Sequence, residues 1–211
     1  MSVAFPVEVE AGLAGIVRPV TWRTGPVRVL DRDARMDEPE RLAAAAMRTA
    51  PEPVDIIAAV RTMYKRLGID PTKTRPSSEA LLRRVRRGDE LPRVNSLVDV
   101  INWTSLETQL SFGLYDVGRI SGAVTLRRGR EGEEYAGIRK DTVHVGGRLV
   151  LADAIGPFGN PTSDSARTMV TPATVDAVVV IYAPAGLSEA VADRARALTE
   201  QRIDQFCRTV E

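Results

Sequence analysis

The stretch RVNSLVDVINWTSLETQLSFGLYDVGRISGAVTLRR, residues 93–128, joins a helix to a series of strands and decides the fold. Asn95 predicts the N-cap of the helix, because an Asn side chain accepts a hydrogen bond from the first-turn N–H groups. Apolar residues spread around most of the circumference of residues 96–110, as expected for a largely buried helix. From Asp116 the pattern changes to short extended segments, which begin with residues 119–128.

One face of this helix departs from the apolar pattern. Asn102, Ser105 and Gln109 stand at positions i, i+3 and i+7, so they share a face with Val98. All three are polar and none is charged. This stripe predicts that the face lines a pocket.

The flanking segments extend the arrangement on both sides. Helices are predicted for residues 38–50, 53–68, 75–88 and 187–207, and Ser77 or Ser78 is the expected N-cap of the third. Short extended segments are expected in the first thirty residues and in residues 133–138. The run TVDAVVVIYA, residues 174–183, predicts a buried central strand.

A further hairpin is predicted in TVHVGGRLVLAD, residues 142–153, where Gly146-Gly147 separates two alternating runs. Strands, helices, strands and a last helix then follow one another along the chain. This order predicts an α+β fold, and we expect residues 1–211 to form a single domain.

Composition indicates an ordinary globular protein. Of the 211 residues, 44% are hydrophobic and 27% charged, and the net charge of +1 gives no strong pull toward nucleic acid or membrane. Cys207 is the only cysteine, so neither an intrachain disulfide nor a cysteine zinc site is expected, and we expect it to be a packing residue. The sequence starts without signal-peptide features and has no long apolar run. We therefore predict a cytoplasmic protein without a membrane partner.

Metal and cofactor chemistry finds little support in the sequence. His144 is the only histidine and lies just before the two glycines, where a structural or solvent-facing role is expected. A two-histidine metal site needs a second histidine, and in a histidine-dependent triad this one residue would have to be the base. Neither site is therefore expected. Neither a Walker-type glycine loop nor a dinucleotide fingerprint is present. We predict no metal and no cofactor.

The segment GNPTSDSARTMVT, residues 159–171, is unusually polar. Such side chains commonly form turns by bonding to nearby backbone groups. They also supply hydrogen-bond donors and acceptors for a ligand, and Arg167 would be available to a carboxylate or a phosphate. Both interpretations stay open for the polar residues of the segment, which are Asn160, Thr162, Ser163, Asp164, Ser165, Arg167 and Thr168.

Basic residues are concentrated between Arg61 and Arg93, a segment that contains ten Lys and Arg residues but only four Asp and Glu. A solvated helix face is one interpretation of this cluster. Contact with nucleic-acid phosphates is the other, and salt would then weaken binding steeply.

The sequence from Arg75 to Asp153 resembles the B3/B4 domain of the phenylalanyl-tRNA synthetase beta subunit. The resemblance is carried by RVNSLVDVINW, LYDVGRISGAVTLRRGREGE and LVLAD, which occur in the family's order, and the best-matching core is residues 65–183. It implies a mixed α/β sandwich that binds a misattached amino acid, tyrosine in the synthetase, and hydrolyses its ester to tRNA. The other synthetase modules are not recognisable, so a free-standing member is expected.

The resemblance also assigns individual positions. The family's pocket asparagine matches Asn102, which the polar stripe singles out independently. Its preceding threonine is replaced by Ile101, and the histidine of the family's HAFD-like motif falls at Gly113. The family's glutamate has no acidic counterpart near VVVIYAP. Asp116 is expected to fix the turn that follows it.

We therefore expect a tRNA-editing-like domain that recognises an aminoacyl-tRNA or its free amino acid and hydrolyses mischarged tRNA in trans. A binding module that kept the fold but lost turnover is the first alternative, and a small-molecule sensor or metabolic enzyme unrelated to tRNA is the second. The expected pocket consists of Asn102, Ser105, Asn160, Ser163, Asp164, Ser165, Arg167 and Thr168, and the expected tRNA contacts are Arg75, Arg83, Arg84, Arg87 and Arg93.

Overall fold

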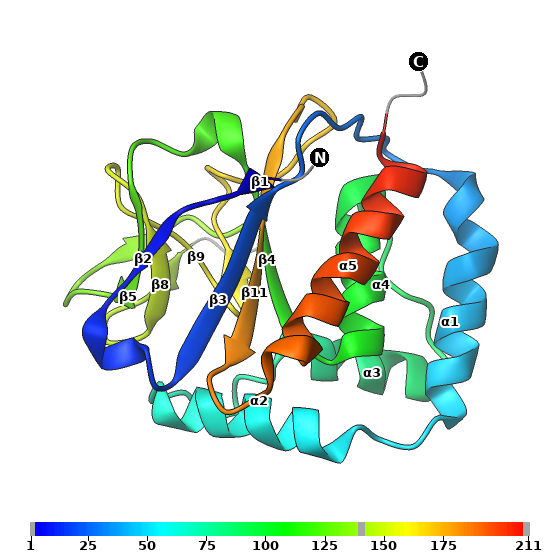
Figure 1. The fold of residues 1–211 in the computed structure, drawn as a ribbon, viewed down its shortest axis with the longest axis horizontal. Helices are drawn as coiled ribbons and strands as arrows, with labels where there is room; N and C mark the ends of the chain where they lie inside the picture. Colours follow the sequence, from blue (N-terminus) through cyan, green and yellow to red (C-terminus); the bar gives the residue numbers. More distant parts are fainter. Residues whose placement is uncertain (1–2, 139–141, 209–211) are drawn as a thin grey trace.

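The computed structural model describes residues 3–138 and 142–208, and its central layer is a four-stranded antiparallel sheet (Figure 1). The strand order is β1-β3-β11-β4, so β11 lies between β3 and β4. Every residue of β11 is buried, which confirms the predicted central strand. The four strands are β1 (Val3–Ala4), β3 (Val17–Arg23), β4 (Ser111–Asp116) and β11 (Ala177–Pro184).

A second sheet of five strands packs on one side of the first (Figure 1). Its order is β10-β9-β8-β5-β2, and only β2 runs parallel to its neighbour, β5. The members are β2 (Val7–Val9), β5 (Val124–Arg128), β8 (Leu149–Ala152), β9 (Pro157–Asn160) and β10 (Ser163–Asp164). A separate pair is formed by β6 (Glu134–Tyr135) and β7 (Val143–His144).

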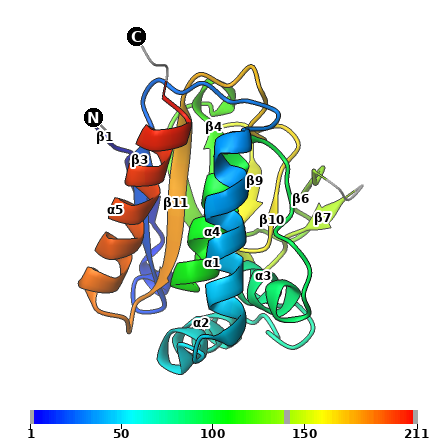
Figure 2. The same cartoon turned by 90° about the vertical axis from the view of Figure 1, so that its right-hand side faces the viewer.

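Helices cover the opposite face of the first sheet. Figures 1 and 2 show α4 and α5 beside that sheet, with α1 outside them and α2 and α3 along one end. The helices are α1 (Asp37–Thr49), α2 (Val54–Arg66), α3 (Ser77–Arg86), α4 (Ser96–Thr108) and α5 (Glu189–Phe206), and the 3-10 turns are η1 (Ala11–Leu13), η2 (Ala34–Met36) and η3 (Val117–Arg119). Helices packed on mixed sheets confirm the α+β prediction.

The predicted hairpin at Gly146-Gly147 is wrong. Gly147 has a φ of 71°, and Arg148 N–H donates to Val145 C=O, so the chain does turn there. The flanking strands nevertheless belong to different sheets, since β7 pairs with β6 while β8 pairs with β5 and β9. Turn chemistry specifies the local reversal, but the hydrophobic partner of each strand decides its pairing.

Helix α4 begins and ends on side chains that the sequence singles out. The Asn95 side chain accepts a hydrogen bond from Val98 N–H at 3.0 Å, which confirms the predicted N-cap. Gln109 lies beyond the last helical residue with a φ of 56°, and its amide donates to Leu106 C=O at 2.6 Å. Gln109 is therefore not part of the predicted polar stripe, because it leaves the helix before its side chain can share that face.

Strand β4 presents different side chains to its two neighbours, because successive residues point to opposite faces of a sheet. Phe112 and Leu114 share the face turned toward the helices. Gly113 and Tyr115 share the other face, where the Tyr115 ring meets Phe158 of β9 edge to face, with centroids 5.0 Å apart. The strand thus connects the helical layer with the second sheet.

Candidate functional site

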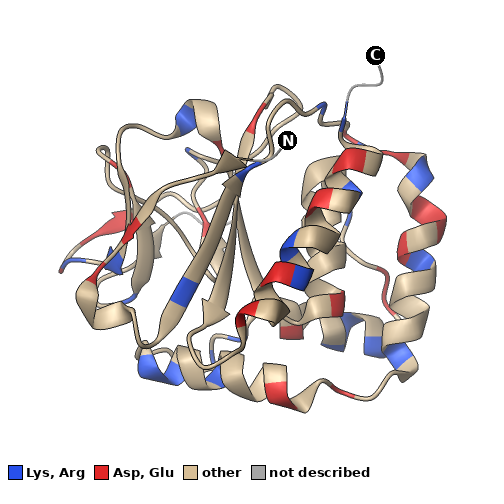
Figure 3. Cartoon of the chain, viewed as in Figure 1, with Lys and Arg blue, Asp and Glu red and all other residues tan. Residues whose placement is uncertain are grey.

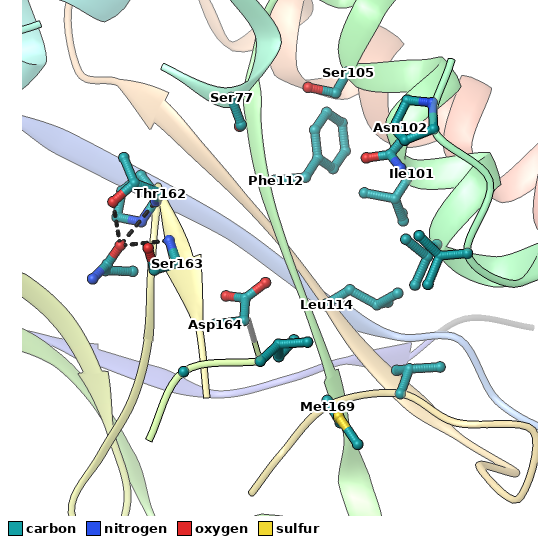
Figure 4. Close-up of a pocket in the computed structure, with 18 of the residues that line it drawn as sticks. Ser77, Ile101, Asn102, Ser105, Phe112, Leu114, Thr162, Ser163, Asp164 and Met169 are labelled. Atoms are coloured by element: carbon teal, nitrogen blue, oxygen red, sulfur yellow. Dashed lines mark hydrogen bonds between the residues drawn. The ribbon is translucent and has the colours of Figure 1, made fainter. Parts of the chain in front are cut away.

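A cavity of about 470 Å³ lies between α4, β4 and the turn that joins β9 to β10 (Figure 4). Helix α4 and the polar segment of residues 159–171 are distant in the sequence, and they face each other across this space. The described residues that line it are Ser77, Leu81, Pro92, Val94, Val98, Ile101, Asn102, Ser105, Phe112, Leu114, Gly137, Ile138, Val143, Asn160, Pro161, Thr162, Ser163, Asp164, Met169 and Val170.

The α4 wall carries two of the expected pocket residues. Asn102 borders the cavity, and its amide has no hydrogen-bond partner within residues 3–138 and 142–208. Both its donor and its acceptor are therefore available to a ligand. The Ser105 hydroxyl, by contrast, donates to Leu110 C=O at 2.7 Å. Ser105 lines the cavity while it also fixes the end of the helix.

Asn160 organises the opposite wall. Its side-chain oxygen accepts hydrogen bonds from the N–H and hydroxyl of Thr162, at 2.8 and 2.7 Å, and from Ser163 N–H at 2.9 Å. Its NH₂ group donates to the Tyr135 hydroxyl at 3.0 Å. These bonds use the amide almost completely, so Asn160 holds the turn through the local bonding typical of such residues.

Asp164 supplies a negative charge to the described lining of the cavity. The Tyr115 hydroxyl donates to Asp164 Oδ1 at 2.7 Å, and the Tyr182 hydroxyl lies 2.9 Å from that of Tyr115. Since Tyr115 has one proton and directs it to the carboxyl, Tyr182 is the donor in the second bond. Burial raises the pKa of Asp164 to about 7, and the hydrogen bond from Tyr115 opposes part of that rise.

Two glycines make room for Tyr115. A Cβ atom at Gly113 would lie 2.4 Å from the Tyr115 hydroxyl, and one at Gly159 would lie 2.3 Å from it. Both separations are far below van der Waals contact. Position 113 therefore has to be glycine for the Tyr115 side chain to reach Asp164 in this arrangement.

Three residues expected in the pocket lie outside its lining. Arg167 is committed to Asp153 through two hydrogen bonds of 2.9 Å, and it also donates to Arg119 C=O. The Ser165 hydroxyl accepts from Arg167 N–H, and Thr168 is fully buried. The expectation that Arg167 is available to a ligand is corrected by this ion pair, which the sequence does not indicate because Asp153 lies fourteen residues away.

Several cavity residues were not anticipated. Ser77 borders the cavity instead of capping α3, and its hydroxyl has no hydrogen-bond partner in the described part of the chain. Phe112 and Leu114 form the apolar wall of β4 in Figure 4. Their alternation with Gly113 and Tyr115 is a strand pattern that could have indicated a wall of this kind. The residues Val94, Ile138 and Met169 are 43%, 49% and 37% exposed, so they lie where the cavity opens.

The arginines expected to contact tRNA differ in exposure and in their ion pairs. Figure 3 shows Lys and Arg on α2 and α3 among acidic residues. Arg61, Arg75 and Arg83 converge on the buried Glu79, with N–O separations of 2.7, 3.4 and 3.5 Å, so positive charge is in excess there. Arg87 is 72% exposed and pairs with Asp89 at 3.2 Å.

Of the two remaining members of the arginine set, Arg84 is exposed and Arg93 is held within the fold. Arg84 donates to Glu90 C=O. Arg93 is only 19% exposed and forms ion pairs with Asp37 and Asp99, each at 3.1 Å, and with Glu40. Three carboxylates around one guanidinium make Arg93 part of the packing between α1 and the start of α4.

The remaining residues named from the sequence lie away from the cavity. His144 is 78% exposed and lies 2.9 Å from a carboxylate oxygen of Glu134. Cys207 is buried, and burial raises the pKa of its thiol to about 11. Asp116 accepts hydrogen bonds from Gly118 N–H and the Thr174 hydroxyl, so it fixes the turn as expected.

Neither a metal cluster nor a membrane helix is seen in the described part of the chain. Residues 3–138 and 142–208 contain no group of three His, Cys, Asp or Glu side chains arranged to hold a metal ion. Across the same residues, no helix combines the length and hydrophobicity that crossing a bilayer requires.

Comparison with known proteins identifies the family. The phenylalanine–tRNA ligase beta subunit of Thiobacillus denitrificans is 35% identical over 135 residues, which cover 62% of this chain and 16% of the relative. The chain thus spans less than a fifth of that relative. An N-terminal fragment of the phenylalanyl-tRNA synthetase beta subunit of Pyrococcus horikoshii aligns with 98% of the chain and 52% of its own, with a TM-score of 0.47 and 12% identity. The B3/4 domain model matches residues 59–211, and the chain therefore belongs to the B3/4 domain family.

Proposed function

We propose that this protein binds the aminoacyl end of a tRNA in the cavity between α4 and the β9–β10 turn, and that it hydrolyses mischarged aminoacyl-tRNA in trans. The observation that carries the proposal is the pairing of two functional groups on one cavity. The amide of Asn102, which has no partner among the described residues, borders it from α4, and the carboxyl of Asp164 borders it from β10. Such a role places the protein in the cytoplasm, where tRNA is charged.

Hydrolysis of an aminoacyl ester needs few catalytic groups. An aminoacyl ester is an activated bond, so an oriented water and a donor for the developing oxyanion supply much of what hydrolysis needs. The Asn102 NH₂ group is a suitable donor, because it makes no hydrogen bond within the described residues. The 2′- or 3′-hydroxyl of the terminal ribose would assist, which compensates for the glycine at the family's histidine position.

The surroundings of the cavity suit the end of a tRNA. Val94, Ile138 and Met169 give its opening an exposed apolar rim, which is available to pack against a nucleobase. Helix α3 contributes Ser77 and Leu81 to the lining, so the arginines it carries lie on an element of the same site. The proposed phosphate contacts are Arg75, Arg83, Arg84 and Arg87, whereas Arg93 is the least suited because its ion pairs hold it inside.

Deacylation of a panel of mischarged tRNAs tests the proposal. We expect the protein to release the amino acid from at least one member, and Asn102→Ala to slow release by roughly tenfold or more. Gln201→Ala is the matched control, because Gln201 is an exposed amide on α5. Absence of release from every tRNA, with binding also absent, would contradict the proposal.

A binding module without turnover is the second candidate. It is favoured by Gly113, which stands where the family has histidine. In that case aminoacyl-tRNA would raise the melting temperature by mass action while the ester stays intact. A small-molecule protein unrelated to tRNA is the third, and it is distinguished by the absence of any salt-dependent tRNA retention.

A further inference from the structure

The cavity has one charged group in its described lining. Among the lining residues within 3–138 and 142–208, Asp164 is the only acidic side chain and no Lys or Arg is present. The other side chains are apolar or neutral and polar. Within the described lining, a ligand that fills this space therefore meets a negative centre without a matching positive one.

The carboxyl of Asp164 is held with one oxygen available. The Tyr115 hydroxyl donates a hydrogen bond to Oδ1, and the Tyr182 hydroxyl is hydrogen-bonded to that of Tyr115. Oδ2 receives no hydrogen bond from the described residues. Figure 4 shows the carboxyl between the Ser163 turn and the apolar side chains of Phe112 and Leu114. The oxygen is thus positioned to accept a hydrogen bond from a group inside the cavity.

We propose that Asp164 binds the α-ammonium group of the ligand, so that the cavity accepts aminoacyl esters and amides with apolar side chains and rejects free amino acids. This inference rests on the proposed function and names its substrate class. The apolar wall that includes Ile101, Phe112 and Leu114 receives the side chain, and about 470 Å³ is within the range of small-molecule sites.

Charge is the basis of the discrimination. An esterified amino acid carries an ammonium and no carboxylate, whereas a free amino acid carries both. In a cavity with one carboxylate and no described cation, the second carboxylate would lose its hydration and meet a like charge. Because a hydrogen bond to a charged group is a strong one, we expect a difference of at least about tenfold in affinity.

Coupling to a proton accompanies this binding mode. The pKa of Asp164 is raised to about 7 by burial, so the carboxyl is partly protonated at neutral pH. An ammonium beside Oδ2 favours the ionised form and lowers that pKa. Below about pH 7, where the α-amino group of the probe is already protonated, binding of the ammonium is therefore accompanied by proton release, which calorimetry detects as a dependence of the heat on the buffer.

The test is calorimetry with three probes built on the same apolar amino acids. The amides of phenylalanine, leucine and methionine carry only the ammonium, the free acids add a carboxylate, and the N-acetyl amides lack the ammonium. We expect an amide to bind at least about tenfold more tightly than its free acid and its N-acetyl form. Asp164→Asn is expected to abolish this preference, whereas the exposed carboxylate variant Glu134→Gln keeps it.

Three outcomes would overturn the inference: equal affinity for amide and free acid, an unchanged preference in Asp164→Asn, or no amide binding at millimolar concentration. Circular dichroism of Asp164→Asn establishes that the variant is folded. Failure of the proposed function is measured separately, as loss of deacylation and of tRNA binding. A protein that deacylates tRNA but treats amide and free acid alike would retain the function without the inference.

Discussion

The hydroxyl of Tyr115 donates a hydrogen bond of 2.7 Å to Asp164, although the two residues belong to different sheets. Tyr115 lies on β4, the edge strand of the first sheet, and Asp164 lies on β10, the edge strand of the second. The bond joins the two sheets beside the cavity. It also sets the position and charge of the one acidic group described in the lining.

Removing the Tyr115 hydroxyl should lower the stability of the fold and raise the pKa of Asp164. Tyr115→Phe leaves Asp164 and Tyr182 each without a partner, so we expect a loss of roughly 1–3 kcal/mol in the free energy of unfolding. The pKa of Asp164 should rise above its value of about 7, because the hydrogen bond now lowers it. Urea denaturation and carboxyl titration by NMR measure the two effects. A double-mutant cycle with Asp164→Ala, which removes the acceptor, isolates the pair, and a coupling energy near zero would refute it.

Stability should depend on pH through Asp164. Its folded pKa of about 7 exceeds the ordinary value of 3.8, so the folded state holds the proton more tightly than the unfolded chain. The free energy of unfolding then falls as pH rises from about 4 to about 7, by up to about 4 kcal/mol, and levels off above that range. Urea denaturation between about pH 4 and pH 8 measures the change.

Asp164→Asn provides the comparison, because an amide keeps the shape of the neutral acid and still accepts from Tyr115. Glu40 also has its pKa raised to about 7 by burial, so wild type and variant share that contribution. We expect the variant to gain stability relative to wild type as pH rises. Parallel curves for the two proteins would show that Asp164 does not titrate in this range.

Sequence reasoning located the cavity better than the side-chain contacts around it. The stripe of α4 and the segment of residues 159–171 do border one cavity, because helical period and polar composition are local properties. The role of Arg167 depends on Asp153, and that of Asp164 depends on Tyr115. Both partners come from distant segments of the chain, so only the tertiary structure reveals them. The prediction of a hairpin at Gly146-Gly147 was wrong for the same reason, because strand pairing is also a long-range property.

Substitution of Gly113 should be costly. Gly113→Ala places a Cβ 2.4 Å from the Tyr115 hydroxyl, and overpacking of this kind typically costs about 1–3 kcal/mol. The hydroxyl would move away from Asp164, so the pKa of that carboxyl should also rise. Thermal denaturation and NMR titration measure these changes. The same substitution in a Tyr115→Ala background should cost much less, and an equal cost in both backgrounds would contradict the steric explanation.

The arginines should separate into structural and tRNA-binding residues. Arg93→Met leaves the buried carboxylates of Glu40 and Asp99 without their cation, so we expect a loss of roughly 3–5 kcal/mol in the free energy of unfolding. Arg83→Ala should leave stability nearly unchanged but reduce by about one the slope of log K for tRNA against log salt. Filter binding over a range of salt concentrations measures that slope. Arg194→Ala on α5 is an exposed control, and an equal effect of this variant would refute a specific contact.

The close approach of Gly113 and Gly159 to the Tyr115 ring limits which side chains can occur together at the site. A histidine fits at position 113 only where the aromatic residue two places along is smaller or turned away. In that case the acid on the neighbouring sheet lacks its donor. Positions 113, 115 and 159 are therefore expected to vary as a set, so that a glycine at 113 with a tyrosine at 115 would distinguish proteins with this acid from those with a histidine at 113.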